Sequence, residues 1–496
     1  MVYSSTRRNE EKVTAAEAIA RGIAEDGGLF VPDEFPEISL SEIEKMCGMD
    51  YAHKAAFVLS RFLTDYTEAE LLAAAQKAYG SGKFDDEEKV PVVSLNDRTH
   101  MLELWHGPTS AFKDMALQLL PHLLTAAVKK TGYRGKTVIL VATSGDTGKA
   151  ALEGFKDVED TQILVFYPVH GVSPMQKLQM ATQEGENVAV CAIRGNFDDA
   201  QSAVKTFFTD ASFARRLADG GMRFSSANSI NWGRLVPQIV YYFSAYCRLV
   251  SDGKIKAGDP INAVVPTGNF GNILAAYYAK RMGLPVHKFV CASNRNNVLT
   301  DFIRTGVYNR NRAFYETTSP SMDILISSNL ERFLYHVTED KPLVSRLMKE
   351  LKENGTYAVP ESVKAAVEAL MDAGDCDENQ TAQTIRSLFE RYRYLCDPHT
   401  AVAVHVYEEY VRRTKDETPT VIASTASPYK FPHSVLSCFE AADAADDFAQ
   451  IDELSALTHT AVPANIRALK TKPVRFDTVI DKEKMAEYIV RQLNLR

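Results

Sequence analysis

The stretch His106-Gly107-Pro108-Thr109-Ser110-Ala111-Phe112-Lys113-Asp114 joins a strand expected at Met101–Trp105 to an apolar helix expected at Met115–Val128. It places one lysine, Lys113, at the junction between the two elements. The positive end of a helix and apolar neighbours such as Phe112 both disfavour an ammonium group. We therefore expect the Lys113 amine to be partly neutral, and a neutral amine can attack a carbonyl carbon. The alternative is an ordinary solvated lysine near a helix start.

Length and composition exclude several classes of protein. With 496 residues, 45% hydrophobic and 24% charged, the chain is typical of a globular protein of roughly two to four domains. Its net charge of -8 comes without a basic run that could follow a nucleic-acid backbone. No apolar run reaches the roughly 18 residues of a membrane span, and the polar start Met1–Lys12 fits neither a secretory signal nor a transit peptide. We expect a cytoplasmic protein without nucleic-acid or membrane partners.

The cysteines give no sign of a metal site. Seven of them are scattered between Cys47 and Cys438 without a C-x-x-C pair, and several lie inside apolar runs, such as Cys191 and Cys247. This pattern favours buried free thiols in a reducing compartment over disulfides or zinc. We expect no bound metal.

The pattern of apolar residues changes along the chain. Up to about residue 100 it is helical in four runs: Ala15–Ala24, Ser41–Met46, Tyr51–Leu63 and Thr67–Tyr79. From there to about residue 300, strands and helices alternate, which implies parallel sheets with ligands beyond the carboxyl ends of the strands. A run of amphipathic helices follows, the fourth at Pro360–Ala373, before a strand at Thr420–Ala423. The expected division is an N-terminal mainly helical domain (1–100), an α/β core (101–300) with a small substrate-side subdomain (about 135–215), a helical insertion (301–395), and a return to the core with a C-terminal segment (396–496).

A first glycine-bearing loop follows the strand expected at Thr137–Ala142. Its residues Ser144-Gly145-Asp146-Thr147-Gly148 offer backbone amides and hydroxyls at a helix start, which together make an anion seat. Gly148-Lys149 is similar to part of a phosphate-binding P-loop. However, Thr143 stands where that motif needs its first glycine, and Ala150 stands where it needs a hydroxyl for magnesium. An ATPase is therefore disfavoured, while a plain glycine-rich helix cap stays open.

A second loop, Gly268-Asn269-Phe270-Gly271-Asn272, follows the strand expected at Ile261–Val265 and opens a helix at Ile273–Arg281. Its two glycines let the backbone curl around an anion, and the amides of the first helical turn point toward it. The order of strand, loop and helix predicts an anion site.

A third polar segment, Asn228–Arg234, precedes a long apolar helix. Arginine has the side chain best shaped for a two-pronged grip on a phosphate. We expect Ser229, Asn231 and Arg234 to face the phosphate of a substrate. The alternative is a helix cap with Arg234 in solvent.

These motifs together resemble those of the threonine synthases, a family that uses pyridoxal 5'-phosphate (PLP). The resemblance rests on six segments in the family's order: Tyr3–Arg7, Asp26–Pro32, His106–Asp114, Ser144–Gly148, Gly268–Asn272 and Ser424–Ala426. It implies PLP fold type II, an α/β fold with open parallel twisted sheets in a large and a small domain, plus the N-terminal helical domain and the helical insertion. It also implies the last step of threonine biosynthesis, in which O-phospho-L-homoserine and water give L-threonine and phosphate. Members with this longer architecture are often monomers, which implies a monomer here.

The same resemblance implies a role for individual residues. Lys113 would hold PLP as a Schiff base and remove the substrate Cα proton. Thr425 would face the pyridine nitrogen, although it could also simply end a strand. The other implied contacts are Gly268, Asn269, Phe270, Gly271 and Asn272 at the cofactor phosphate, and Ser144, Gly145, Asp146 and Thr147 at the substrate carboxylate. His399, in a further family-like stretch, is expected to be structural.

Two other functions stay open at this point. One is a lyase of the same fold that acts on serine, threonine or a phosphorylated amino acid and releases ammonia. The other is a relative that binds a metabolite without converting it. Lys113 argues against the second, since a passive phosphate binder needs no buried amine. The products would separate the first from a threonine synthase.

Overall fold

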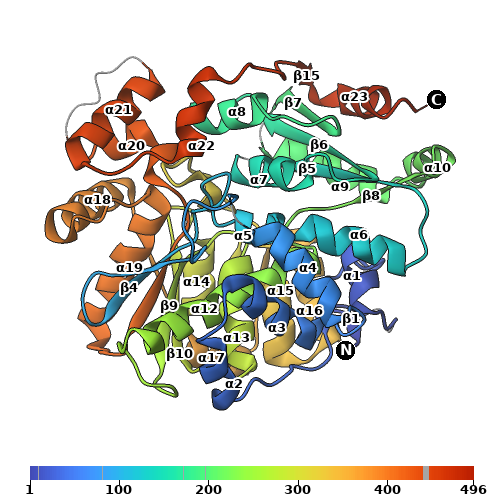
Figure 1. Ribbon diagram of the computed structural model, residues 1–496. Coiled ribbons are helices and arrows are strands. Elements are labelled where there is room, and N and C mark those ends of the chain that lie inside the picture. The colour runs from blue at the N-terminus through green and yellow to red at the C-terminus, as the bar shows by residue number, and fades with distance from the viewer. Residues whose placement is uncertain are drawn as a thin grey trace.

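The computed structural model contains two mainly parallel sheets, which lie one above the other in Figure 1. It describes residues 1–8, 11–80, 82–143, 145–170, 172–195, 197–439 and 446–495. The lower sheet runs β13 (Met371–Asp375), β10 (Val286–Ser293), β9 (Ile261–Pro266), β14 (Thr420–Ser424), β4 (Thr99–Glu103), β3 (Val92–Ser94). The upper sheet runs β15 (Val479–Asp481), β7 (Val188–Arg194), β6 (Thr161–Pro168), β5 (Lys136–Ala142), β8 (Met222–Ser225). Apart from the antiparallel pair β3–β4, the neighbouring strands described in both sheets run parallel.

Both sheets are buried on their two faces, which explains the continuous apolar sequence of their central strands. In β5, Val138 and Leu140 join one apolar cluster, whereas Ile139 and Val141 join another. This alternation is the two-residue period of a strand with a helical layer on each side. The alternation of strands and helices therefore correctly predicted an α/β fold of parallel sheets.

Helices cover these faces and connect the strands. In chain order through the core they are α5 (Asp114–Leu117), α6 (Leu120–Lys130), α7 (Asp146–Phe155), α8 (Pro174–Ala181), α9 (Phe197–Thr209), α10 (Ala211–Asp219), α11 (Trp232–Leu235), α12 (Pro237–Ser251), α13 (Gly271–Arg281), α14 (Val298–Thr305) and α19 (Pro398–Thr414). Helices α13 and α19 both contact β9 and β10, and α9 contacts β5 and β6. The expected helix Met115–Val128 is broken into α5 and α6, because Pro121 in the first turn of α6 has no amide hydrogen to continue a helix.

The N-terminal region is helical, as its periodicity predicted. After the short strand β1 (Tyr3–Ser5), which pairs with β2 (Phe30–Pro32), its helices are α1 (Ala15–Arg21), α2 (Leu40–Met46), α3 (Tyr51–Phe62) and α4 (Glu68–Tyr79). Thr14, Ser39 and Thr67 each begin a helix with a reciprocal capping box, which satisfies amides that the first turn leaves open. Phe62 packs on Trp232 and Tyr278, so this region shares the core of the lower sheet.

The segment 301–395 is mainly helical but also contains strands. Its elements are β11 (Val307–Asn309), the short 3-10 helix η1 (Pro320–Met322), α15 (Leu330–Thr338), α16 (Lys341–Asn354), β12 (Thr356–Ala358), α17 (Glu361–Leu370), β13 and α18 (Glu378–Tyr392). The helix expected at Pro360–Ala373 is wrong in its last part, because β13 pairs with β10 at the edge of the lower sheet. A short apolar run has no period of its own, so its pairing partner decides its structure.

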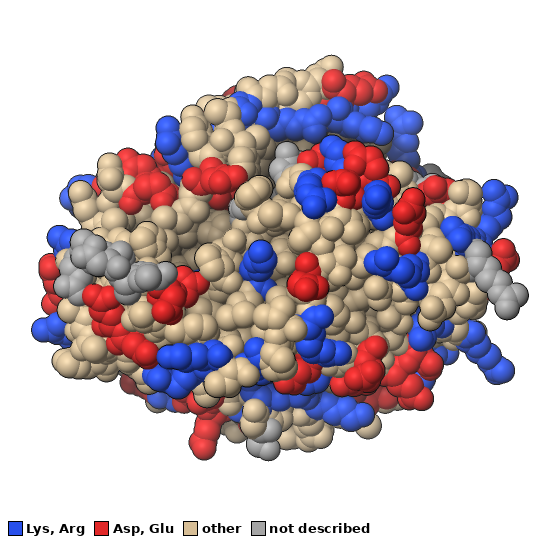
Figure 2. All heavy atoms as spheres, turned by 90° about the horizontal axis from the view of Figure 1, so that it is seen from above, with Lys and Arg blue, Asp and Glu red and all other residues tan. Residues whose placement is uncertain are grey.

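The C-terminal segment returns to both sheets. After β14 come η2 (Pro428–Lys430), α20 (Pro432–Leu436), α21 (Asp447–Thr458), α22 (Ala464–Arg467), η3 (Ala468–Thr471), β15, η4 (Lys482–Lys484) and α23 (Met485–Gln492). Strand β15 extends the upper sheet beside β7, far from the N-terminus in Figure 1. Seen from above, the surface carries both basic and acidic side chains among uncharged ones (Figure 2). Within the described part of the chain, no helix has the length and apolar character that a membrane crossing needs.

Four strands of the two sheets end at one cavity. Strands β4, β5, β9 and β14 lead directly into the segments that carry Lys113, Asp146, Gly268 and Thr425. All four residues line a single cavity of about 1470 Å³. Ligand sites in open α/β sheets lie at this position, so the fold brings the predicted loops together.

Candidate active site

Lys113 lies in a loop that is bonded to the end of strand β14. Ala111 and Ala426 form an isolated antiparallel bridge, and the amide of Ser427 donates to the carbonyl of Ser110 at 3.1 Å. The loop therefore cannot move independently of the strand, and it holds the lysine at the start of α5.

The Lys113 amine is buried and faces two oxygen acceptors. Its Nζ lies 3.1 Å from Ser321 Oγ and 3.4 Å from Asp146 Oδ2. Burial lowers the pKa of Lys113 to about 8; Asp146 opposes the shift, and the positive charges of Lys430 and Arg234 add to it. A substantial share of neutral amine is thus present just above neutral pH, as the sequence predicted.

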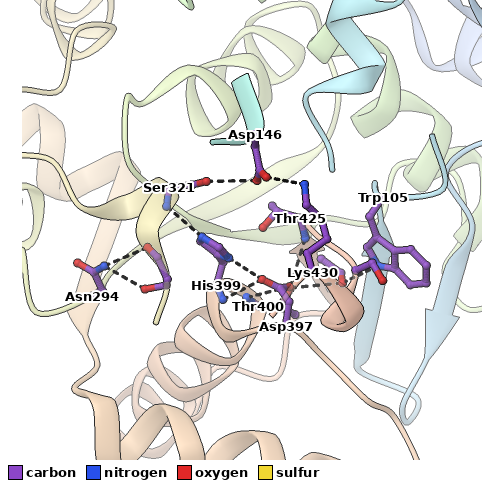
Figure 3. A network of polar contacts seen from close by, with 12 residues as sticks. Trp105, Asp146, Asn294, Ser321, Asp397, His399, Thr400, Thr425 and Lys430 are labelled. Atoms are coloured by element: carbon purple, nitrogen blue, oxygen red, sulfur yellow. Dashed lines mark hydrogen bonds and ion pairs between the residues drawn. The ribbon is translucent and has the colours of Figure 1, made fainter. Parts of the chain in front are cut away.

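Asp146 opens helix α7 with a carboxylate that already has four donors. Lys430 Nζ donates to Oδ1 at 2.5 Å and Ser321 Oγ donates to Oδ2 at 3.3 Å (Figure 3). Gln176 Nε2 also donates to Oδ1, at 2.8 Å, and Lys113 Nζ donates to Oδ2. Burial alone would raise the pKa of Asp146, but the two lysine ammonium groups outweigh it and hold that pKa well below its usual range. Asp146 is therefore an ionised carboxylate whose oxygens are occupied.

The glycine loop after β9 is shaped for an anion. Phe270 has a left-handed backbone (φ +61°), and a Cβ on Gly268 would lie only 2.6 Å from the carbonyl oxygen of Ser321. Asn272 Oδ1 accepts a hydrogen bond from the Tyr242 hydroxyl, which leaves the buried Asn272 Nδ2 without a partner among the described residues. An amide donor kept free at the start of helix α13 fits the phosphate of PLP.

Arg234 provides a second anion site in the same cavity. Its guanidinium donates to the carbonyl of Ala227 at 2.8 Å and to Thr147 Oγ at 3.3 Å. No described carboxylate lies within ion-pair distance of it. Burial lowers the pKa of Arg234 to about 10, so the group stays charged at neutral pH. A buried guanidinium without a counter-ion is suited to an anionic ligand.

A polar network behind the cavity positions Ser321 and Thr425. His399 Nε2 accepts from the amide of Ser321 at 3.2 Å, and His399 Nδ1 lies 2.6 Å from Asp397 Oδ1. Asp397 also binds the hydroxyl of Thr400, which accepts from the amide of Thr425 at 3.3 Å (Figure 3). Thr425 lines the same cavity as the glycine loop.

Three family models match successive parts of the chain, and together they cover most of it. Residues 2–79 match the family model "Threonine synthase N terminus", 91–425 match "Pyridoxal-phosphate dependent enzyme", and 400–489 match "Threonine synthase, C-terminal". A threonine synthase of Schizosaccharomyces pombe is 35% identical over 97% of this chain and 94% of its own length. The chain belongs to the threonine synthase family.

Two further comparisons define the extent of the likeness. A crystal structure of PLP-bound threonine synthase from Brucella melitensis has a TM-score of 0.87 and 36% identity, over 99% of each chain. The family's PLP fold type II and its PLP dependence are thereby confirmed for this chain. The human protein Threonine synthase-like 1 is 42% identical over 87% of this chain, and the chain spans 59% of that protein's length.

Most of the predicted threonine synthase residues line one cavity. These are Lys113, Asp146, Thr147, Ser229, Arg234, Gly268, Asn269, Phe270, Gly271, Asn272 and Thr425. Gly145 is the N-cap of α7 and does not line the cavity. Its φ is +138°, and a Cβ there would lie 2.5 Å from the Gln176 side chain, so the turn requires glycine. Ser144 lies outside the described residues.

The surroundings of Asn231 and Asp146 limit how the side chains of these two predicted substrate contacts can act. Asn231 caps α11 through Gly233, its Nδ2 donates to the carbonyls of Ile19 and Ser226, and it is absent from the cavity lining. Because all of its polar atoms are used, we propose that Asn231 shapes the loop rather than contacting substrate. The Asp146 carboxylate cannot hold a substrate carboxylate, because both groups are anions.

Sequence reasoning did not identify Lys430 or Ser321 as site residues. Lys430 follows the Ser424–Ala426 motif by a few residues and stands between Tyr429 and Phe431. A lysine between two aromatic residues after a strand end could have indicated a buried amine near the site. Ser321 lies in the helical insertion, where no local pattern pointed to the site. His399 is structural as expected, but it supports Ser321 directly.

Proposed function

We propose that this chain makes L-threonine and inorganic phosphate from O-phospho-L-homoserine and water. The observation that carries the proposal is that a buried lysine amine with a pKa of about 8 shares one cavity with two anion sites. The substrate carries a phosphate, and the cofactor carries another, so both sites have an occupant.

Lys113 would bind the cofactor and act as the base. Its Nζ, when not bonded to the cofactor, would remove the substrate Cα proton, which the lowered pKa of Lys113 permits near neutral pH. The resulting ammonium lies beside the Asp146 carboxylate and Ser321 Oγ, which stabilise it. PLP, when bound, withdraws the electrons left on Cα.

Two anion sites would orient the reactants. Asn272 Nδ2, Gly268 and the first turn of α13 hold the cofactor phosphate, and Thr425 meets the ring nitrogen. Arg234, with Thr147 and Ser229 nearby, binds the substrate phosphate and stays with it as the Cγ–O bond breaks. A proton would leave Cβ as the Cγ–O bond breaks. Protons added at Cγ and at Cα would then make the methyl group and restore the Cα–H bond, and the hydroxyl from water would bond to Cβ, while the other proton of water goes to the released phosphate. The backbone amides of Asp146 and Thr147, the first two residues of α7, would hold the substrate carboxylate.

The test is product analysis with O-phospho-L-homoserine and the PLP-loaded protein. We expect phosphate and threonine in equal amounts. Keto acid and ammonia would instead identify a lyase of the same fold. Bound, coloured cofactor without any product from this substrate or from serine and threonine would identify a metabolite-binding protein.

We also propose a cytoplasmic monomer with the four-part division 1–100, 101–300, 301–395 and 396–496. Six of the seven free cysteines are buried, which suits a reducing compartment. The cavity gathers both anion sites from one chain, so no partner residue is needed to complete them. The mixed surface charge in Figure 2 supports a small-molecule substrate rather than nucleic acid. Light scattering after gel filtration measures the oligomeric state, and a dimer would overturn that part.

A further inference from the structure

Lys430 is a second buried lysine that the mechanism above does not use. It ends η2, and its side chain has no exposed surface. Its Nζ donates to Asp146 Oδ1 at 2.5 Å (Figure 3). It also donates to the carbonyl of Thr109 at 3.2 Å. The residue does not line the cavity, so it contacts neither ligand.

A buried ammonium is costly unless it balances another buried charge. Asp146 needs such a balance, because its side chain is only 3% exposed. Lys113, its other cationic neighbour, cannot supply it throughout a reaction cycle. Whenever Lys113 is linked to the cofactor or is a neutral amine, Lys430 is the ammonium that remains beside Asp146.

We propose that Lys430 is a positioning residue that keeps Asp146 ionised and fixed beside Lys113, and that its positive charge favours the neutral amine of Lys113. The inference rests on the proposed function only in that Lys113 is the cofactor lysine. The Asp146 carboxylate can then pair with the Lys113 ammonium. When Lys113 loses its proton, Asp146 still has Lys430 as a buried counter-ion.

The electrostatics around the pair agree with this assignment. Burial is the largest cause of the lowered pKa of Lys113, and the charge of Lys430 lowers it further. Asp146 acts in the opposite direction. The charged groups that act on Lys113 are Asp146, Lys430 and Arg234, and Lys430 also acts on Asp114. On the far side of Ser321, His399 and Asp397 are the next titratable groups.

The test is Lys430→Met, which keeps the length of the side chain and removes its charge. Lys113 should then hold its proton more tightly. The pH at which half of its amine is neutral and reactive should rise by about one unit, which leaves roughly tenfold less neutral amine at pH 7. Reaction with small amounts of acetic anhydride across a pH series, read by mass spectrometry of the Lys113 peptide, measures this in the full-length, cofactor-free protein. Lys430→Arg, which keeps the charge, should match the wild type.

Asp146→Asn added to Lys430→Met gives a matched variant without either charge. It removes the carboxylate that favours the Lys113 ammonium. The midpoint of the Lys113 labelling curve against pH should therefore return toward the wild-type value. A labelling curve of Lys430→Met that coincides with wild type, or a double variant with a still higher midpoint, would overturn the proposal. If Lys430→Met fails to fold and the double variant folds, the charge-balancing role is supported. If both fail to fold, Lys430 serves packing and the proposal falls.

A separate measurement distinguishes failure of this inference from failure of the proposed function. Visible absorption on adding PLP reports the linkage to Lys113 and needs no substrate. If the wild type develops none, the cofactor role of Lys113 is lost, while the labelling curves still measure whether Lys430 controls the Lys113 proton.

Discussion

The backbone amide of Phe112 donates a hydrogen bond to the carbonyl of Thr425 at 2.8 Å. One backbone contact therefore connects the residue beside the cofactor lysine to the residue proposed to meet the ring nitrogen. The amide of Leu104 bonds the carbonyl of Ser424 at 2.9 Å at the end of the parallel β4–β14 ladder. The two ends of the cofactor site are thus spaced by the pairing of β4 with β14, and not by flexible side chains.

Removing the Lys113 amine should stop the chemistry without unfolding the protein. We expect Lys113→Ala to lose the visible absorption of the lysine-linked cofactor and at least about a thousandfold in kcat, because both linkage and base are gone. Circular dichroism should be unchanged. Lys177→Ala, at an exposed position of α8, is the control and should keep both signals. A coloured and active Lys113→Ala protein would remove Lys113 from the mechanism.

Removing the Arg234 guanidinium should weaken binding of the phosphate. Charge-assisted hydrogen bonds contribute about 1.5–3 kcal/mol each, so Arg234→Ala should raise KM for O-phospho-L-homoserine by roughly tenfold to a hundredfold. Inhibition by homoserine, which lacks the phosphate, should change little. Arg412→Ala, at an exposed arginine, is the control. Equal losses with both ligands would make Arg234 a structural residue.

A methyl group at position 268 should disturb the phosphate loop. The Cβ of Gly268→Ala would lie 2.6 Å from the backbone oxygen of Ser321, which cannot swing away as a side chain can. We expect the Kd for PLP to rise at least about tenfold, because the loop must shift. Titration of the apoprotein with PLP measures this. Gly48→Ala, whose Cβ would be 3.8 Å from its nearest neighbour, should bind PLP normally. Normal binding by Gly268→Ala would show that the loop adapts.

His106 should make stability depend on pH. Burial lowers its pKa, but hydrogen bonds to Asp85 (2.6 Å) and Glu103 (2.9 Å) outweigh this and raise the pKa to about 9. The folded value lies above the unfolded value of about 6.5, so the stabilisation is complete below pH 6.5 and is lost as pH rises through 9.

His106→Gln should therefore melt below wild type at pH 6 and close to it at pH 10. We expect a difference of about 2 °C at pH 6, since partial exposure screens these ion pairs. Calorimetry at the two pH values measures it. His405→Gln, at a partly exposed histidine of α19, is the control. A deficit of equal size at both pH values would show that packing and not charge is responsible.

Local patterns predicted much of the fold. The helices at Tyr51–Leu63 and Thr67–Tyr79 are confirmed within a residue or two, because each carries its own apolar period and its own cap. Strand β5 is confirmed because a buried parallel strand is a continuous apolar run. Strands β13 and β15 were not predicted, since each forms by pairing with a strand distant in the sequence. The four-part division of the chain stays a prediction.

The amino-acid sequence by itself determined the fold class, the family and the loops at the strand ends, and it predicted Lys113 as the cofactor lysine, because each depends on residues that are neighbours in the chain. Only the tertiary structure decided that Asp146 is shared by Lys113 and Lys430, that Asn231 is used up as a cap, and that Ser321 reaches the lysine amine. Charge balance and hydrogen-bond saturation depend on which groups meet in space, and the loops that bring these groups together come from strands far apart in the chain.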